Sequence, residues 1–176
     1  MTTASLETIP VLDLNQWTAD SDTILVQALS EFGLAHISGH GIADELLHGF
    51  YSEFQSILSR PVAEKASWGG VSNWFQRGWT PPDTERAVIA GGQPDFKECF
   101  FAAPIPTDPQ CKWEHPEIYA DNVWPKDASA FKSNYLQMGS RLHEVGLMLL
   151  RATARGLNLE PDVFAKRVEG GPHVTR

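Results

Sequence analysis

The chain has 176 residues, enough for one domain with an apolar core but too few for two large domains. Its 14 Lys and Arg residues against 22 Asp and Glu residues give a formal net charge of −8, which argues against a phosphate-binding surface and so against a nucleic-acid partner. The longest apolar run, 145–150 apart from one glycine, is far shorter than a membrane span, and residues 1–10 lack the pattern of a secretory signal. Cys99 and Cys111 are too widely spaced for a metal or redox motif, so we expect free thiols in a cytoplasmic protein with no membrane partner.

The first sixty residues predict strands and helices in alternation. Apolar and polar residues alternate over 9–14 and over 34–38, which is typical of short strands. A helix that ends at Gly33 lies between them, and a second helix is expected from a cap at Asp44 to Pro61. The apolar faces of these two helices are expected to consist of Leu25, Ala28, Leu29 and Phe32 in the first, and of Leu47, Phe50, Phe54 and Ile57 or Leu58 in the second.

The middle of the chain, 67–127, has little periodicity. It holds five of the six tryptophans and eight prolines, and that many prolines exclude a long helix. One strand-like run stands out at 98–102. A long connection of this kind is either functional or mobile.

The strongest helix signal follows, with a cap at Asp127 and a stop at Gly156. Its apolar positions step by four and three, which predicts a largely buried face made of Phe131, Tyr135, Met138, Leu142, Val145, Leu149 and Ala152. A short helix is expected from Pro161. Residues 173–176 read as the first residues of a strand.

A metal site has only one formal candidate. Two histidines and a carboxylate can hold Fe(II) on one face, and His115, Glu117 and His173 supply those groups. The first two lie in a proline-rich loop that does not aim them rigidly, so we expect an exposed loop histidine instead. We expect ordinary structural roles for the other histidines, which are His36, His40, His48 and His143.

Arg77 is the most notable charged residue of the middle stretch. Its planar guanidinium suits carboxylate recognition, and Trp74 and Trp79 could form a dry wall around it. A surface arginine stacked on tryptophan is the alternative. An ordinary surface cluster is the expected role of the three nearby charged residues, which are Asp95, Lys97 and Glu98.

The order of several short segments resembles the N-terminal region of the iron(II)/2-oxoglutarate-dependent oxygenases of the isopenicillin N synthase type. The most specific segments are Gly-x-x-x-Ile-x-Gly-His-Gly-Ile at 33–42 and Asp-x-Lys-Glu-x-Phe at 95–100. The others are IPVLDL at 9–14, RGW at 77–79, NVWP at 122–125, the long helix and PHVTR at 172–176. The resemblance covers nearly the whole chain.

The resemblance implies an α+β fold, namely the helix-rich N-terminal portion (1–170) of a double-stranded β-helix, or jelly-roll, oxygenase. Residues 171–176 would begin the first core strand, and the rest of the core would be absent from this chain. The complete enzyme would use Fe(II), 2-oxoglutarate and O₂ to oxidise a small organic substrate, releasing succinate and CO₂. The family's iron ligands, a His-x-Asp pair and a distal His, lie in that core, so we expect no catalytic or metal-binding residue, no bound cofactor and no activity in these 176 residues alone.

Three substrate-binding residues are implied by position in the family. Arg176 resembles a residue that points from the first core strand toward the substrate, while Arg77 and Glu85 lie in a loop that can cover the substrate. We therefore expect Arg77 and Arg176 to face a common cavity. The alternatives are a 2-oxoglutarate-independent oxidase of the same family, half of a split enzyme whose β-helix is a separate segment or chain, and a non-catalytic partner-binding module.

Overall fold

A computed structural model describes residues 6–70, 76–86, 91–114, 116 and 119–176, without the side chains of 111 and 112. The fold is α+β and rich in helix, as the sequence predicts. It divides into two compact units. Unit 1 combines the described residues up to Ile42 with Arg141–Glu169, and unit 2 combines Ala43–Ser140 with Gly170–Arg176.

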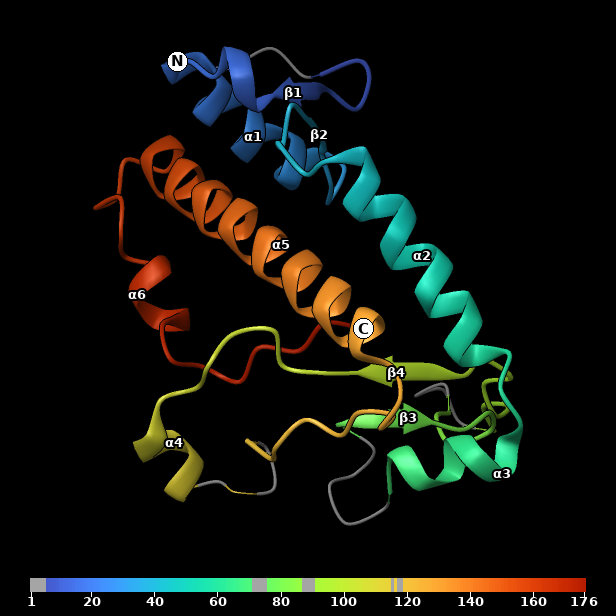
Figure 1. The fold of residues 1–176 in the computed structure, drawn as a ribbon. Helices are drawn as coiled ribbons and strands as arrows, with labels where there is room; N and C mark the ends of the chain where they lie inside the picture. The colour runs from blue at the N-terminus through green and yellow to red at the C-terminus, as the bar shows by residue number, and fades with distance from the viewer. Residues whose placement is uncertain (1–5, 71–75, 87–90, 115, 117–118) are drawn as a thin grey trace. The chain divides into compact units, whose positions relative to one another are not determined.

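Unit 1 contains a small parallel sheet and the helix that connects its strands. Strand β1 (Val11–Asp13) is followed by a 3-10 turn, η1 (Leu14–Gln16), by helix α1 (Ala19–Glu31) and by strand β2 (His36–Ser38). The two strands lie side by side (Figure 1), and the register places Val11 beside His36 and Asp13 beside Ser38. Leu12, Leu25 and Ala152 form the core of this unit. Both predicted strands and the first predicted helix are confirmed, although Leu29 remains 42% exposed.

Local side-chain bonds fix the ends of α1. Thr18 and Ser21 form a capping box at its start, and Gly33 adopts a positive φ of 75° just after its end. Asp22 in the first turn is 7% exposed and accepts two hydrogen bonds from Arg155, both at 2.8 Å. Trp17 donates a third through Nε1 at 2.8 Å. These bonds tie the start of α1 to the end of the long helix.

Unit 2 begins with helix α2 (Asp44–Leu58), which confirms the second predicted helix. Ala43 occupies the cap position and no side chain caps the helix, so the predicted cap at Asp44 was wrong. Helix α3 (Val62–Lys65) and the 3-10 turn η2 (Ala66–Trp68) follow. Strand β3 (Gly78–Thr80) pairs antiparallel with β4 (Cys99–Phe101), and helix α4 spans Pro109–Glu114. The strand expected at 98–102 is confirmed, whereas β3 and α4 had no sequence signal.

An aromatic cluster forms the core of unit 2. The rings of Phe100 and Phe131 lie 5.0 Å apart, edge to face, and Tyr135 packs against both. Phe54 on α2 lies 5.9 Å from Phe131, and Trp124 lies 5.7 Å from Phe100. Rings from α2, from β4 and from residues 124–135 therefore form one core.

The long helix α5 (Ser129–Gly156) is confirmed, and it ends at Gly156 as expected. Asp127 lies outside the helix, and its carboxylate accepts a hydrogen bond from Arg60. The residue with positive φ after the helix is Asn158, at 56°. Leu142 is 49% exposed, so the predicted apolar face is not buried along its whole length.

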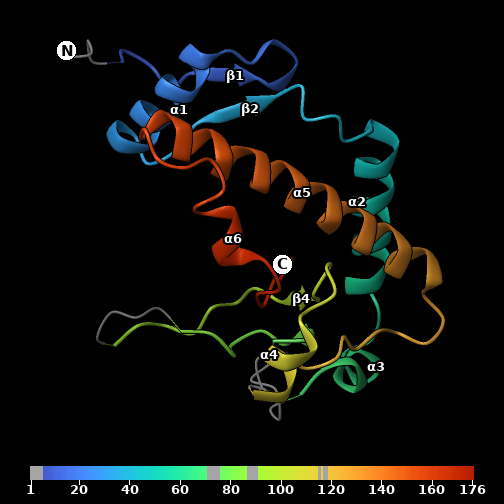
Figure 2. The same ribbon diagram turned by 90° about the vertical axis from the view of Figure 1, so that its left-hand side faces the viewer.

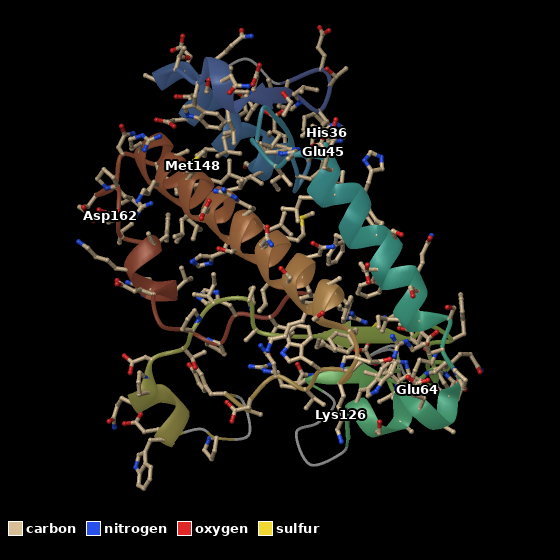
Figure 3. The ribbon with its side chains drawn as sticks, viewed as in Figure 1. His36, Glu45, Glu64, Lys126, Met148 and Asp162 are labelled. Atoms are coloured by element: carbon tan, nitrogen blue, oxygen red, sulfur yellow. The ribbon has the colours of Figure 1, made fainter. Side chains whose placement is uncertain are left out.

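The short helix expected after Pro161 is α6 (Ala165–Val168). Figure 3 shows Asp162 in the turn before it, where the carboxylate pairs with Arg151 at 2.7 Å. The strand expected at 173–176 is a single antiparallel bridge between Thr175 and Ala102, next to β4. None of the helices in the described part of the chain is long and apolar enough to cross a membrane.

Candidate functional site

The candidate site lies on one face of the β3–β4 pair. Side chains alternate between the two faces of a strand. Phe100 points into the aromatic core, so Cys99 and Phe101 lie on the opposite face. Thr80 stands directly across from Cys99 in the antiparallel register and shares that face with it. All of these residues are buried.

Arg176 lies over this face and contacts it at several points. Its Nε and Nη2 atoms lie 3.4 and 3.3 Å from Cys99 Sγ, and its guanidinium carbon lies 5.1 Å from the centre of the Phe101 ring. Nη2 also donates a hydrogen bond to Glu85 Oε2 at 2.6 Å. The structure therefore brings together two of the three substrate-binding residues that the sequence predicted, Arg176 and Glu85.

Glu85 is carried on a narrow two-stranded arm, which we define as residues 83–86 and 91–95. The amide of Asp83 donates to the carbonyl of Asp95 at 2.7 Å, and the amide of Asp95 donates to the carbonyl of Glu85 at 2.8 Å. Arg86 and Pro94 form a further bridge. Figure 2 shows these two segments running side by side away from β3 and β4.

Charges alternate in sign around the base of the arm. Lys97 Nζ lies 3.0 Å from Glu85 Oε2 and also contacts the carboxylate of Asp95. Hydrogen bonds from Lys97 and Arg176 hold the pKa of Glu85 below its ordinary value. The bonds to Cys99 and Glu85 raise the pKa of Arg176. Glu85, Lys97 and Arg176 are thus charged near neutral pH.

Arg77, the third predicted substrate residue, is almost completely buried. Only 1% of it is exposed, and it donates hydrogen bonds to the carbonyls of Ala120 at 2.9 Å and Gln76 at 2.7 Å. Burial lowers the pKa of its guanidinium. The alternative of an exposed arginine stacked on tryptophan was wrong. Trp74, one of the two tryptophans expected to form a wall around Arg77, lies outside the described residues.

Arg77 lines a cavity of about 290 Å³, which is also walled by Pro104, Ile105, Tyr119 and Asn122. Arg176 is not part of this wall. The expectation that Arg77 and Arg176 face one common cavity was therefore wrong for this cavity. The physical reason is that the Arg176 guanidinium is held by Cys99 and Phe101 on the face of β4.

One buried charged group was missed by sequence reasoning. Lys65 is 4% exposed and donates to Glu98 Oε2 at 2.6 Å and to the carbonyl of Leu58 at 2.7 Å. Trp79 Nε1 donates to the same oxygen of Glu98 at 2.6 Å. The description of Asp95, Lys97 and Glu98 as an ordinary surface cluster holds for the first two and was wrong for Glu98. Glu98 lies within Asp-x-Lys-Glu-x-Phe, and that motif was the available signal.

The described residues contain no group of three His, Cys, Asp or Glu side chains that could hold a metal ion. His115 and Glu117 lie outside the described residues, so the structure does not address the formal triad that they make with His173. His40 accepts a hydrogen bond from the amide of Ile42 through Nδ1 at 3.1 Å, and His48 Nδ1 lies 2.8 Å from the carbonyl of Asp44. These two histidines have the ordinary structural roles that were expected.

Similar proteins were found at the level of sequence. Curated relatives include a leucoanthocyanidin dioxygenase of Petunia hybrida, which is 24% identical in an alignment of 169 positions that covers 92% of this chain and 36% of that protein. A kihadalactone A synthase of Citrus sinensis is 29% identical over 82% of this chain and 43% of that protein. The chain therefore spans less than half the length of these relatives.

Solved structures resemble the fold over nearly the whole chain. A 2OG-Fe(II) oxygenase family protein from Caulobacter crescentus matches with a TM-score of 0.79 and 24% identity, covering 94% of this chain and 54% of that one. A Neurospora crassa protein solved in complex with alpha-KG matches with a TM-score of 0.75 and 17% identity, covering 94% of this chain and 52% of that one. The family model of the N-terminal region of the non-haem dioxygenase in morphine synthesis matches residues 9–127, more than half of the chain. The chain therefore belongs to the non-haem dioxygenase family and corresponds to its N-terminal region.

Proposed function

We propose that the chain is the N-terminal part of an Fe(II)/2-oxoglutarate-dependent oxygenase. The complete protein oxidises a small organic substrate with O₂, while 2-oxoglutarate is converted to succinate and CO₂. The observation that carries this proposal is the family-model match over residues 9–127. The fold shared with oxygenases of the 2OG-Fe(II) family supports it independently.

The described residues contribute to substrate binding in this proposal. Arg176 and Glu85 lie together over the β3–β4 face, and the arm that carries Glu85 covers part of the site. Arg77 contributes through the separate cavity that it lines. A guanidinium held by buried neighbours is well suited to orient an acidic or polar group of a substrate.

Iron and 2-oxoglutarate are not assigned to any residue of this chain. The described residues offer no cluster of three metal-binding side chains, so they do not fit an iron centre. We propose that both cofactors bind in the part of the family's fold that these 176 residues do not span. The helices and strands described here would support that part and shape the substrate entrance.

The test compares residues 1–176 alone with the same residues joined to the jelly-roll part of a family enzyme. We expect stoichiometric iron binding and 2-oxoglutarate-dependent succinate release only from the joined protein. Stoichiometric iron with turnover by residues 1–176 alone would contradict this assignment. The variant His173→Ala would then show whether the triad with His115 and Glu117 holds the metal.

A further inference from the structure

We propose that the ion pair between Glu85 and Arg176 is a displaceable latch. In the closed state, the Glu85 carboxylate occupies the place on Arg176 where a substrate carboxylate binds. The arm opens when the substrate carboxylate displaces Glu85. This inference rests on the proposed function, because it takes Arg176 to face the substrate. It adds that the substrate is a small organic acid and that Glu85 competes with it.

The guanidinium is held in place independently of the arm. Cys99 Sγ lies 3.4 Å from Nε, and the ring of Phe101 lies beneath the guanidinium. Two backbone hydrogen bonds between Thr175 and Ala102, at 3.2 and 2.9 Å, fix the preceding residue beside β4. Arg176 therefore keeps its position when Glu85 leaves, and it presents Nη2 to another carboxylate.

The bond that would break is accessible to water. The side chain of Arg176 is 43% exposed and that of Glu85 is 34% exposed. An ion pair exposed to this extent is only weakly stabilising, so an incoming carboxylate can compete with it. The same exposure gives a solute access to the guanidinium.

Glu85 retains a partner after the exchange. Lys97 Nζ lies 3.0 Å from the same Oε2 atom that Arg176 contacts, and it also pairs with Asp95. When a substrate carboxylate takes Arg176, the carboxylates of Glu85 and Asp95 therefore both keep Lys97 as a cationic partner. An exchange that keeps every charge paired carries only a small energetic penalty.

The experiment uses NMR on residues 1–176 with hexanoate as the probe and neutral hexanamide as its matched control, at constant ionic strength. The reporters are the Nε–H resonance of Arg176 and the hydrogen-exchange rates of the Asp83 and Asp95 amides, which close the arm. We expect hexanoate to shift the Arg176 resonance and to speed exchange at both amides about twofold to fivefold, the range for an exposed ion pair. Hexanamide should do neither.

Variants separate the latch from carboxylate binding. Glu85→Gln should speed exchange without any probe and should bind hexanoate about twofold to fivefold more tightly, because the competitor is gone. Arg176→Gln should also speed exchange and should not respond to hexanoate. Glu144→Gln, which breaks an exposed pair with Arg141 on α5, should leave the arm unchanged.

Two results would overturn the latch. A shift of the Arg176 resonance without faster amide exchange would leave carboxylate binding intact and remove the latch. No shift in either the parent chain or Glu85→Gln would remove both the latch and the substrate-facing role of Arg176. Neither result depends on succinate release, which tests the proposed function separately.

Discussion

Lys65 and Glu98 lie 33 residues apart and meet in an ion pair of 2.6 Å between α3 and the start of β4. The lysine is 4% exposed, and its ammonium also lies 5.2 Å from the centre of the Trp79 ring. A buried ammonium is tolerated only when its charge is balanced and its hydrogen bonds are satisfied. The pairing with the buried Lys65 therefore gives a physical reason for the glutamate in the motif at 95–100.

Removing the carboxylate should destabilise the fold strongly. In Glu98→Ala the ammonium of Lys65 stays buried without a counter-ion, and we expect the free energy of unfolding to fall by about 3 kcal/mol. Glu64→Gln is the matched control, because it removes an exposed charge partner of Arg60 from the same short helix (Figure 3) and should cost less than about 1 kcal/mol. Urea unfolding measures both. Equal small losses would show that the buried pair does not stabilise the fold.

Tyr135 should make stability depend on pH in the alkaline range. Burial raises the pKa of its phenol well above the ordinary value of 10.0, and the carbonyls of Phe100 and Thr175 both lie within hydrogen-bond distance of the hydroxyl and share its single proton. The unfolded chain therefore loses this proton first. The contribution of the protonated Tyr135 phenol to the free energy of unfolding is complete below pH 10. It is lost as pH rises above 10, by at most about 1.4 kcal/mol per pH unit.

The measurement is the free energy of unfolding between pH 8 and pH 11. Tyr135→Phe should lower stability by about 1–2 kcal/mol at pH 8, because two carbonyls lose their donor. It should also flatten the decline above pH 10. Tyr51→Phe is the control, since Tyr51 is 60% exposed and should change neither quantity. A decline of the same steepness in Tyr135→Phe would assign the pH dependence to another group.

The sequence predicted the elements whose apolar residues repeat over several turns. α1, α2 and α5 have such repeats, and each was predicted from them. β3 spans three residues and begins at Gly78, whose φ of 78° no periodicity announces. The start of α5 was predicted less well than its end. Asp127 was taken as a cap, but it lies outside the helix and its carboxylate accepts a hydrogen bond from Arg60.

The candidate site was predicted only in part, and for a physical reason. Arg176 and Glu85 were assigned to the substrate by resemblance, but their direct pairing depends on how the arm and the 173–176 segment meet over β4. Arg77 was read as a lid residue, yet 99% of its surface is covered and its hydrogen bonds go to backbone carbonyls. Spacing along the chain does not show whether a charged side chain points inward.

Two neighbouring positions of α5 test how far its apolar face is buried. Met138 is 3% exposed, so Met138→Ala should lower the free energy of unfolding by about 2–4 kcal/mol. Leu142, one turn later, is 49% exposed, and Leu142→Ala should cost less than about 1 kcal/mol. Thermal melts of both variants give the comparison. A loss at Leu142 as large as that at Met138 would mean that this part of the face is covered in solution.

Two glycines of the same helix should respond in opposite directions to alanine. A Cβ atom at Gly156 would clash with the carbonyl of Asp22 and lie 2.7 Å from Cγ2 of Val26, whereas a Cβ at Gly146 meets nothing within 4 Å. Gly146→Ala should therefore stabilise the fold by about 0.5–1 kcal/mol, because alanine has the higher helix propensity. Gly156→Ala should destabilise it by about 1–3 kcal/mol, because α1 must move to admit the methyl group. Urea unfolding of the two variants measures the difference, and stabilisation in both would show that α1 does not approach the end of α5 this closely.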